Sequence, residues 1–152
     1  IRLDNIINAS KSPIKILLAS QKLCSKIIKT LLSTEINYKN NNFLDYVNKS
    51  KNNLPTHTVA YGVFCQSVGI ERERAIEGFL YSYTSSTITN CVKSIPLSQT
   101  QGQQLLYKSH DIFEEVINKL DELTIDDLCL STPGFDIRCM QHENLYSRLY
   151  MS

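Results

Sequence analysis

The residues best suited to bind a metal or act as a nucleophile lie near the carboxyl end of the chain. Cys139 and His142 are three positions apart, so on a helix their side chains would share one face. Such a pair could hold a soft or borderline metal, or form a nucleophile and base if a third group oriented the histidine. Cys129 follows Asp126 and Asp127 and offers a thiolate beside two carboxylates. A small half-buried thiol is the simpler interpretation of both cysteines, and Cys129 is kept as the candidate metal ligand.

Motifs for nucleotide binding and for hydrolytic catalysis are absent from the sequence. The five glycines are isolated, and neither a phosphate-binding loop nor a Gly-x-Gly-x-x-Gly fingerprint occurs. No Gly-x-Ser-x-Gly elbow or His-Glu-x-x-His helix is present. His57 and His110 stand apart from other candidate ligands and are interpreted as structural. We therefore expect a protein that is not an enzyme and that binds no cofactor stably.

The composition is that of an ordinary globular protein. Hydrophobic residues make up 42% and charged residues 20% of 152 residues, which predicts one domain with a proper core. A net charge of +1 provides no general basic field for nucleic acid, and the short apolar runs predict no membrane span. Five cysteines without a Cys-x-x-Cys pair favour reduced thiols in the cytoplasm. Because the chain opens at Ile1, we expect part of the natural N-terminus to be missing.

Apolar residues recur at helical spacing along most of the chain, and no segment alternates convincingly as a strand does. Ser12-Pro13 predicts a helix start with proline at the first helical position, followed by an amphipathic helix with a basic outer face. Further helices are expected at residues 43–47, at residues 59–68 ending at Gly69, and at residues 71–95. Small polar residues at 82–90 predict the close approach of another helix.

The last third of the chain holds two more expected helices. Ser98 and Gln101 have the capping-box pattern and open the first of them. Asp126-Asp127 predicts a short turn, residues 131–134 break the chain, and helical spacing then continues to the end through Leu145 and Leu149. These patterns predict an all-α, single-domain bundle of about six to seven helices over residues 1–152. Residues 131–152 form its C-terminal tail.

The tail has the composition of an interface. Residues 142–152 combine aromatic, leucine and methionine side chains with Arg148, the types that are enriched in binding hot spots. Chain ends are usually polar and frayed. The tail should therefore dock either on its own domain or on a partner, and composition alone leaves both open.

Three ordered sequence blocks resemble the UreF family of urease accessory proteins. The first contains Ala60-Tyr61-Gly62 and Val68-Gly69-Ile70, and the second contains Pro96-Leu97-Ser98-Gln99 with Gly102-Gln103, where Ser98 replaces a family glycine. The third runs from Asp136-Ile137 through His142-Glu143 to Tyr146-Ser147-Arg148-Leu149-Tyr150, where Tyr150 replaces phenylalanine. The resemblance covers essentially all 152 residues, whereas the family's Asp-, Pro- and Gly-rich N-terminal segment is missing.

The resemblance implies an all-helical homodimer that acts as a chaperone in nickel insertion and metallocentre assembly. It implies that the protein binds a UreD-type (also called UreH-type) accessory protein, recruits a UreG-type GTPase and serves apo-urease, with nickel only in transit. The residues expected to bind partners are Lys93, His142, Glu143, Tyr146, Ser147, Arg148, Leu149, Tyr150 and Met151.

Two alternatives to a simple scaffold stay open at this stage. Arg148 could act as an arginine finger that activates the UreG-type GTPase. Cys129 could instead relay nickel. The sequence does not indicate which surface contacts which partner, or whether GTP hydrolysis is stimulated or restrained.

Overall fold

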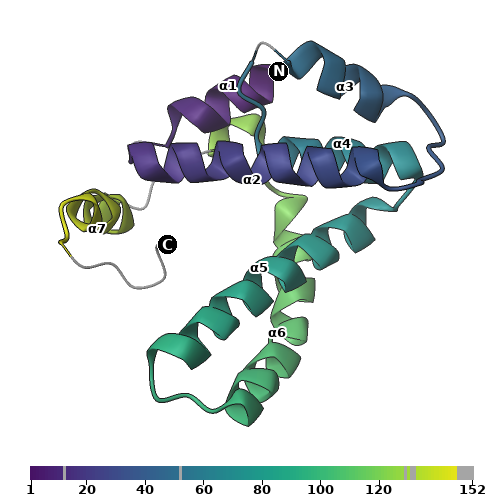
Figure 1. The fold of residues 1–152 in the computed structure, drawn as a ribbon. Coiled ribbons are helices and arrows are strands. Elements are labelled where there is room, and N and C mark those ends of the chain that lie inside the picture. The colour runs from purple at the N-terminus through teal and green to yellow at the C-terminus, as the bar shows by residue number, and fades with distance from the viewer. Residues whose placement is uncertain (12, 52, 129, 131–132, 147–152) are drawn as a thin grey trace. The chain divides into compact units, whose positions relative to one another are not determined.

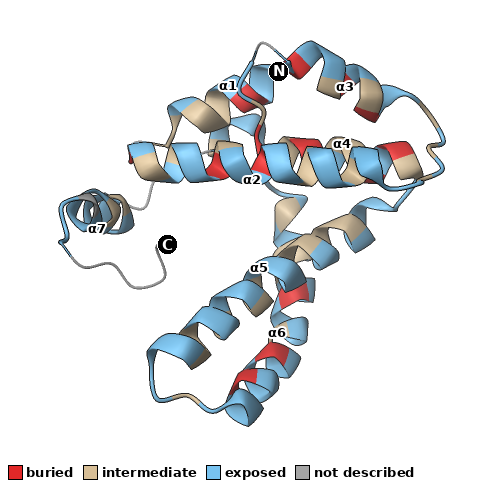
Figure 2. Ribbon diagram, viewed as in Figure 1, coloured by how far each residue is buried: buried red, intermediate tan, exposed pale blue. Residues whose placement is uncertain are grey.

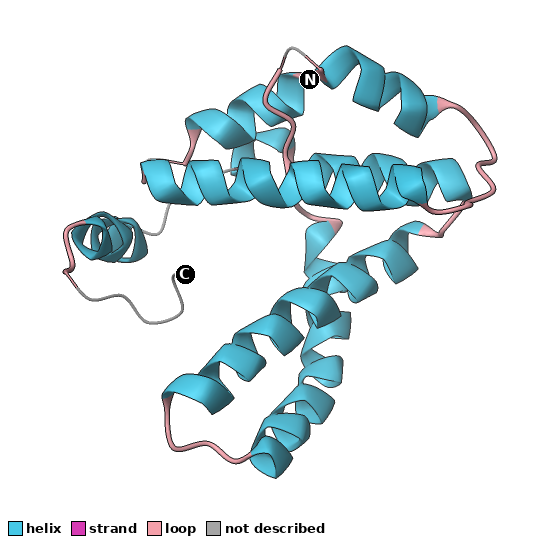
Figure 3. Ribbon diagram, viewed as in Figure 1, coloured by secondary structure: helices cyan, strands magenta, loops and turns pink. Residues whose placement is uncertain are grey.

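The computed structural model describes the whole chain except residues 12, 52, 129, 131–132 and 147–152 (Figure 1). Among the described residues it contains seven α-helices, one short 3₁₀ helix and no strand (Figure 3). The prediction of an all-α fold with six to seven helices is confirmed. The chain divides into two compact units, Ile1–Val68 with Asp127–Ser152, and Gly69–Asp126. That these units form one domain stays a prediction.

The first unit is built around three packed helices. It contains α1 (Arg2–Ala9), α2 (Ile14–Ser33), α3 (Asn42–Ser50), α4 (His57–Val68) and α7 (Pro133–Glu143). Helix α4 packs against both α2 and α3. Its core consists of one buried residue from each of these helices, Cys24, Tyr46 and Ala60, surrounded by Ile28, Val47, Val59 and Val63. The helix predicted at residues 59–68 is therefore present within α4, and Gly69 follows it with a positive φ of 79° that favours glycine.

A buried carboxylate ties α1 to the other helices of this unit. Asp4 is fully buried, and its Oδ1 accepts hydrogen bonds from the Tyr46 hydroxyl at 3.0 Å and from the Thr56 amide and hydroxyl at 2.7 and 2.9 Å. Burial, and next the charge of Asp4, raise the pKa of the Tyr46 hydroxyl, which therefore stays a donor. Asp4 thus joins α1, α3 and the residue that precedes α4.

The second unit is a helical hairpin of α5 (Arg72–Ser94) and α6 (Gln99–Leu120), followed by the 3₁₀ helix η1 (Ile125–Asp127). The predicted capping box is present, with Ser98 Oγ accepting from the Gln101 amide at 3.2 Å and Gln101 Oε1 accepting from the Ser98 amide at 2.9 Å. A Cβ atom on Gly102 would lie only 2.9 Å from Val92 Cγ2. Helices α5 and α6 therefore approach closely at Gly102, whereas the approach predicted at the small polar residues 82–90 stays a prediction.

Some sequence predictions differ from the structure. Helix α2 begins at Ile14 after Pro13, one residue later than expected, and Ser12 lies outside the described residues. Residues 133–134 open α7 instead of breaking the chain, because proline is well suited to the first helical position. The prediction that the helix continues to the end is wrong at Leu145, since α7 ends at Glu143 and a turn follows.

Candidate functional site

The described part of the C-terminal tail presents its side chains to solvent. Helix α7 exposes large apolar residues on its surface, namely Phe135, Ile137 and Met140. His142 lies in its last turn, and beyond the helix Leu145 is 52% exposed and Tyr146 is fully exposed. Within the described part of the chain, Tyr146 therefore does not pack on its own unit, and its contact with a partner stays a prediction.

Several predicted site residues cannot be placed. Glu143 ends α7, but its side chain is not described. Ser147, Arg148, Leu149, Tyr150 and Met151 lie outside the described residues, as does the candidate metal ligand Cys129. Lys93 is exposed in the last turn of α5 and so belongs to the second unit, whereas α7 belongs to the first.

A groove of about 570 Å³ lies between α2 and α7 in the first unit. It is lined by Lys15, Ile16, Leu18, Ala19 and Lys22 from α2, and by Arg138, Cys139 and His142 from α7. The spacing argument correctly brought Cys139 and His142 to one face of a helix. The contribution of α2 to this groove was not predicted, although regularly spaced lysines beside isoleucine and leucine are visible in the sequence of this helix.

The lining of this groove combines basic side chains with apolar ones. None of its described lining residues is acidic. The described residues contain no group of three or more His, Cys, Asp or Glu side chains that could hold a metal ion. Elsewhere in the unit, burial, and next the charge of Asp4, raise the pKa of the Cys24 thiol to about 11.

Both isolated histidines have contacts inside the fold. Lys11 Nζ donates to Ser20 Oγ at 2.6 Å, and the same oxygen lies 3.4 Å from His57 Nδ1. Burial, and next the charge of Lys11, lower the pKa of His57. In the second unit the His110 ring lies 5.4 Å from the Phe113 ring and 5.9 Å from the Tyr81 ring, measured between centroids. These contacts agree with a structural role for both histidines.

Comparison with known proteins identifies the family. Residues 1–110 match the sequence profile of the UreF family, which is most of the chain and includes two of the three resembling blocks. The chain belongs to the UreF family. The resemblance inferred from the sequence is therefore confirmed.

Individual relatives cover different shares of the chain. The chain is 38% identical over 99 residues to the urease accessory protein UreF of Nitrosospira multiformis, an alignment covering 65% of this chain and 42% of that protein. It is 30% identical over 157 residues to the UreF protein of Sporosarcina pasteurii, covering all of this chain and 75% of that protein. For the UreF protein of Bacillus sp. strain TB-90 the identity is 27% over 154 residues, covering all of this chain and 66% of that protein.

The chain therefore spans about two fifths of the length of the first relatives that it matches. The alignments to the Sporosarcina and Bacillus proteins include α7 and the terminal motif. No helix of the described residues has the length and hydrophobicity that a membrane-spanning segment needs.

Proposed function

We propose that this UreF-family chain is a scaffold in the maturation of urease and acts by binding partners, without catalysing a reaction itself. Its family membership supports the role, since relatives with similar sequences carry the name urease accessory protein. The observation that carries the proposal is the full exposure of Tyr146, together with the apolar side chains on α7. Large apolar side chains exposed beside one another are typical of interaction sites.

The proposed partner of the tail is a UreD-type accessory protein. Its binding surface comprises Tyr146 and the terminal residues through Met151, with His142 and Glu143 at the end of α7. Lys15, Lys22, Arg138 and His142 around the α2–α7 groove favour an acidic partner surface, because charges of opposite sign steer association. Lys93, in the second unit, would contact a partner separately.

The scaffold would then recruit a UreG-type GTPase and serve apo-urease. In this proposal nickel is cargo and is not held stably by the chain, which works in the cytoplasm as a homodimer. The second unit supports the association of two copies or of a copy with a partner, since Tyr83 and Tyr107 are 69% and 79% exposed there. Aromatic side chains of this kind are enriched at protein interfaces.

Reconstitution tests the proposal. Apo-urease, nickel, GTP, the UreG-type GTPase and the UreD-type protein are combined with and without the full-length protein. Urease activity should depend on the protein, while the protein alone should not hydrolyse GTP. Equal urease activity without it would contradict the proposal.

A single-turnover measurement of GTP hydrolysis by the GTPase separates the scaffold from a GTPase activator. No change in the hydrolysis rate on adding the protein is expected for the scaffold. A rise in the rate of GTP hydrolysis that disappears in an Arg148→Ala variant would favour the arginine-finger alternative. Arginine fingers increase the rate of GTP hydrolysis by about 10³–10⁵. A comparison of nickel binding by the wild type and by a Cys129→Ala variant, measured by titration, tests whether Cys129 relays nickel.

A further inference from the structure

The outer face of α2 carries positive charge that is not balanced within the helix. Its residues Ile14–Ser33 include four lysines and no Asp or Glu. The helix buries Ser20 and Cys24 on its inner side, whereas Lys22, Lys26 and Lys29 are exposed. Within the described part of the chain, none of these three lysines forms an ion pair with a carboxylate. An unpaired cationic face of this kind suits an acidic binding partner.

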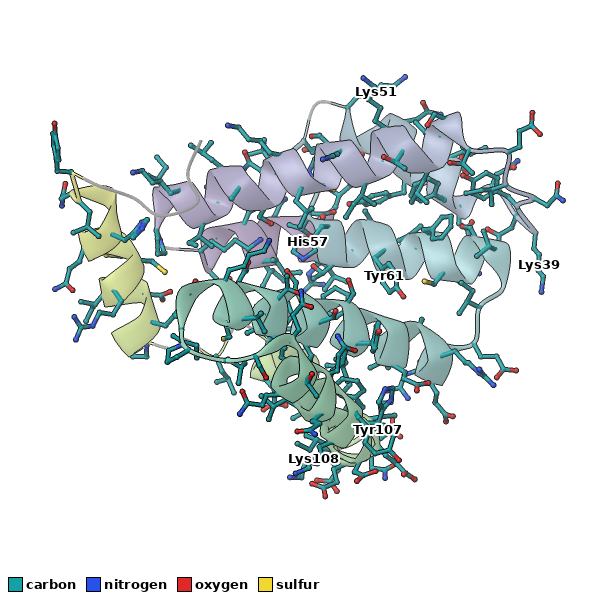
Figure 4. The ribbon with its side chains drawn as sticks, turned by 60° about the horizontal axis from the view of Figure 1, so that its bottom comes forward. Lys39, Lys51, His57, Tyr61, Tyr107 and Lys108 are labelled. Carbon is teal, nitrogen blue, oxygen red and sulfur yellow. The ribbon has the colours of Figure 1, made fainter. Side chains whose placement is uncertain are left out.

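One edge of this face borders a second groove, which we call the α2–α3 groove. It has a volume of about 560 Å³ and lies between α2, the end of α3 and the following loop. Its described lining residues are Ser25, Ile28, Lys29, Leu32, Ser33, Val47, Ser50, Lys51, Asn53 and Pro55. Four of these are apolar, two are cationic, and none is acidic. Lys51 projects outward from the end of α3 (Figure 4).

The serine side chains of the α2–α3 groove already use their donors within the fold, and Asn53 uses one of its two. The hydroxyls of Ser25, Ser33 and Ser50 donate to the backbone carbonyls of Gln21, Thr30 and Val47 at 2.9–3.0 Å, and Asn53 Nδ2 donates to the Lys49 carbonyl at 3.0 Å. Each hydroxyl oxygen therefore has only acceptor capacity left. The ammonium groups of Lys29 and Lys51, with no hydroxyl donors around them, make a poor phosphate site. They suit carboxylates that are carried by a larger ligand with its own apolar groups.

We propose that the α2–α3 groove binds an acidic amphipathic helix of a partner protein. Apolar side chains of that helix, spaced three and four residues apart, pack on Ile28, Leu32, Val47 and Pro55. Its carboxylates lie beside Lys29 and Lys51. A helix is favoured over a lipid surface because the apolar residues line a concave site between two elements, whereas a bilayer contacts a projecting face.

This proposal goes beyond the tail contact and does not depend on it. None of the described residues of the α2–α3 groove belongs to α7 or to the tail. A protein without residues 146–152 should therefore retain this binding while it loses the UreD-type partner. Failure of one interaction is thus distinguishable from failure of the other.

The test uses a labelled helical peptide and the full-length protein. The peptide is about 18 residues long, roughly five turns, with leucines three and four apart and glutamates beside them. Fluorescence anisotropy should show saturable binding. A peptide with Gln at every Glu should bind at least about tenfold more weakly, which corresponds to about 1.4 kcal/mol.

Variants of the protein locate the peptide. Reversing both groove charges, Lys29→Glu with Lys51→Glu, should weaken binding by at least about tenfold. Lys26→Glu is the matched control, because Lys26 lies on the same helix but not in the described groove lining, and it should change binding by less than about threefold. Leu32→Gln should weaken the binding of both peptides. Circular dichroism confirms that each variant remains helical.

Three results would overturn the proposal. The first is equal binding of the acidic and the neutral peptide, or unchanged binding after the double charge reversal. The second is binding to phosphatidylserine vesicles without binding to the peptide, which would assign the face to a membrane. The third is dissociation of a homodimer by the double reversal, seen in sedimentation, which would make a second copy the occupant.

Discussion

The two compact units of the molecule bury their side chains to different extents (Figure 2). In the first unit Asp4, Cys24, Phe43 and Ala60 have no exposed surface. In the second unit α5 contains no buried residue at all, and α6 buries only Gly102, Leu106 and Phe113 among its described residues. The first unit therefore has an internal core, whereas the hairpin depends on a narrow line of contact between two helices.

The two units are stabilised by different interactions. The first unit is held by a core and by the hydrogen bonds to Asp4. The hairpin is held by the close approach at Gly102 and by an exposed ion pair between Arg72 Nη1 and Asp121 Oδ1 at 2.6 Å. Exposed ion pairs contribute at most about 1 kcal/mol. The hairpin also leaves large apolar residues exposed, among them Tyr83, Tyr107 and Ile112.

Removal of the Asp4 carboxylate should have the largest effect on stability. Asp4→Ala leaves the Tyr46 hydroxyl and both Thr56 donors unpaired, and each buried unpaired group costs about 1–3 kcal/mol. We expect the free energy of unfolding of the first unit to fall by about 3 kcal/mol or more. Chemical denaturation measures it. Tyr46→Phe removes one donor and should cost no more than about 1.5 kcal/mol, so equal losses in the two variants would argue against this account.

A methyl group at Gly102 should separate the two helices of the hairpin. The new Cβ would lie 2.9 Å from Val92 Cγ2 and 3.2 Å from Ile88 Cγ2, both on stiff β-branched side chains. Gly102→Ala should therefore lower the free energy of unfolding of the second unit by about 1–3 kcal/mol. Gly62→Ala is the matched control in α4, because no atom lies within 4 Å of its added Cβ. That control should be neutral or stabilising by up to about 1 kcal/mol, and a stabilised Gly102→Ala would refute the close contact.

A change in pH should have a smaller effect on the free energy of unfolding, and only in the first unit. Burial and Lys11 lower the pKa of His57 in the folded protein, so the unfolded chain binds a proton more readily. The unfolding free energy should therefore decrease as the pH falls through 6.5, the ordinary histidine value. The decrease should be weaker in a His57→Gln variant. Hydrogen exchange of α4 and α5 amides follows each unit separately, and an equal His57-dependent response in α5 would contradict the assignment.

The sequence predicted the long helices well because local chemistry determines their ends. The Ser98–Gln101 capping box and Gly69 are signals within a few residues, and both appear in the structure. Helix α1 was missed, since it has eight residues and no side-chain cap. The role of Asp4 could not be predicted either, because its donors lie 42 and 52 positions away along the chain.

The candidate site was predicted in part. Residues 139 and 142 share a groove as their spacing indicated, and the exposed Tyr146 agrees with a tail available to partners. The involvement of α2 was not predicted, because a lysine-rich helix face usually faces only solvent. Which helices border such a face depends on tertiary packing, and that information is not local in the sequence.

We propose that the tail binds the UreD-type partner and that the fold does not need the tail. Calorimetric titration of the full-length protein with that partner should be compared with a variant lacking residues 146–152 and with Arg148→Ala. The deletion should abolish measurable binding, and Arg148→Ala should weaken it by roughly thirtyfold, about 2 kcal/mol, as expected for a hot-spot arginine. Both variants should keep the helicity and thermal midpoint of the parent. Binding of the truncated protein with unchanged affinity, or loss of its helical signal, would contradict the account.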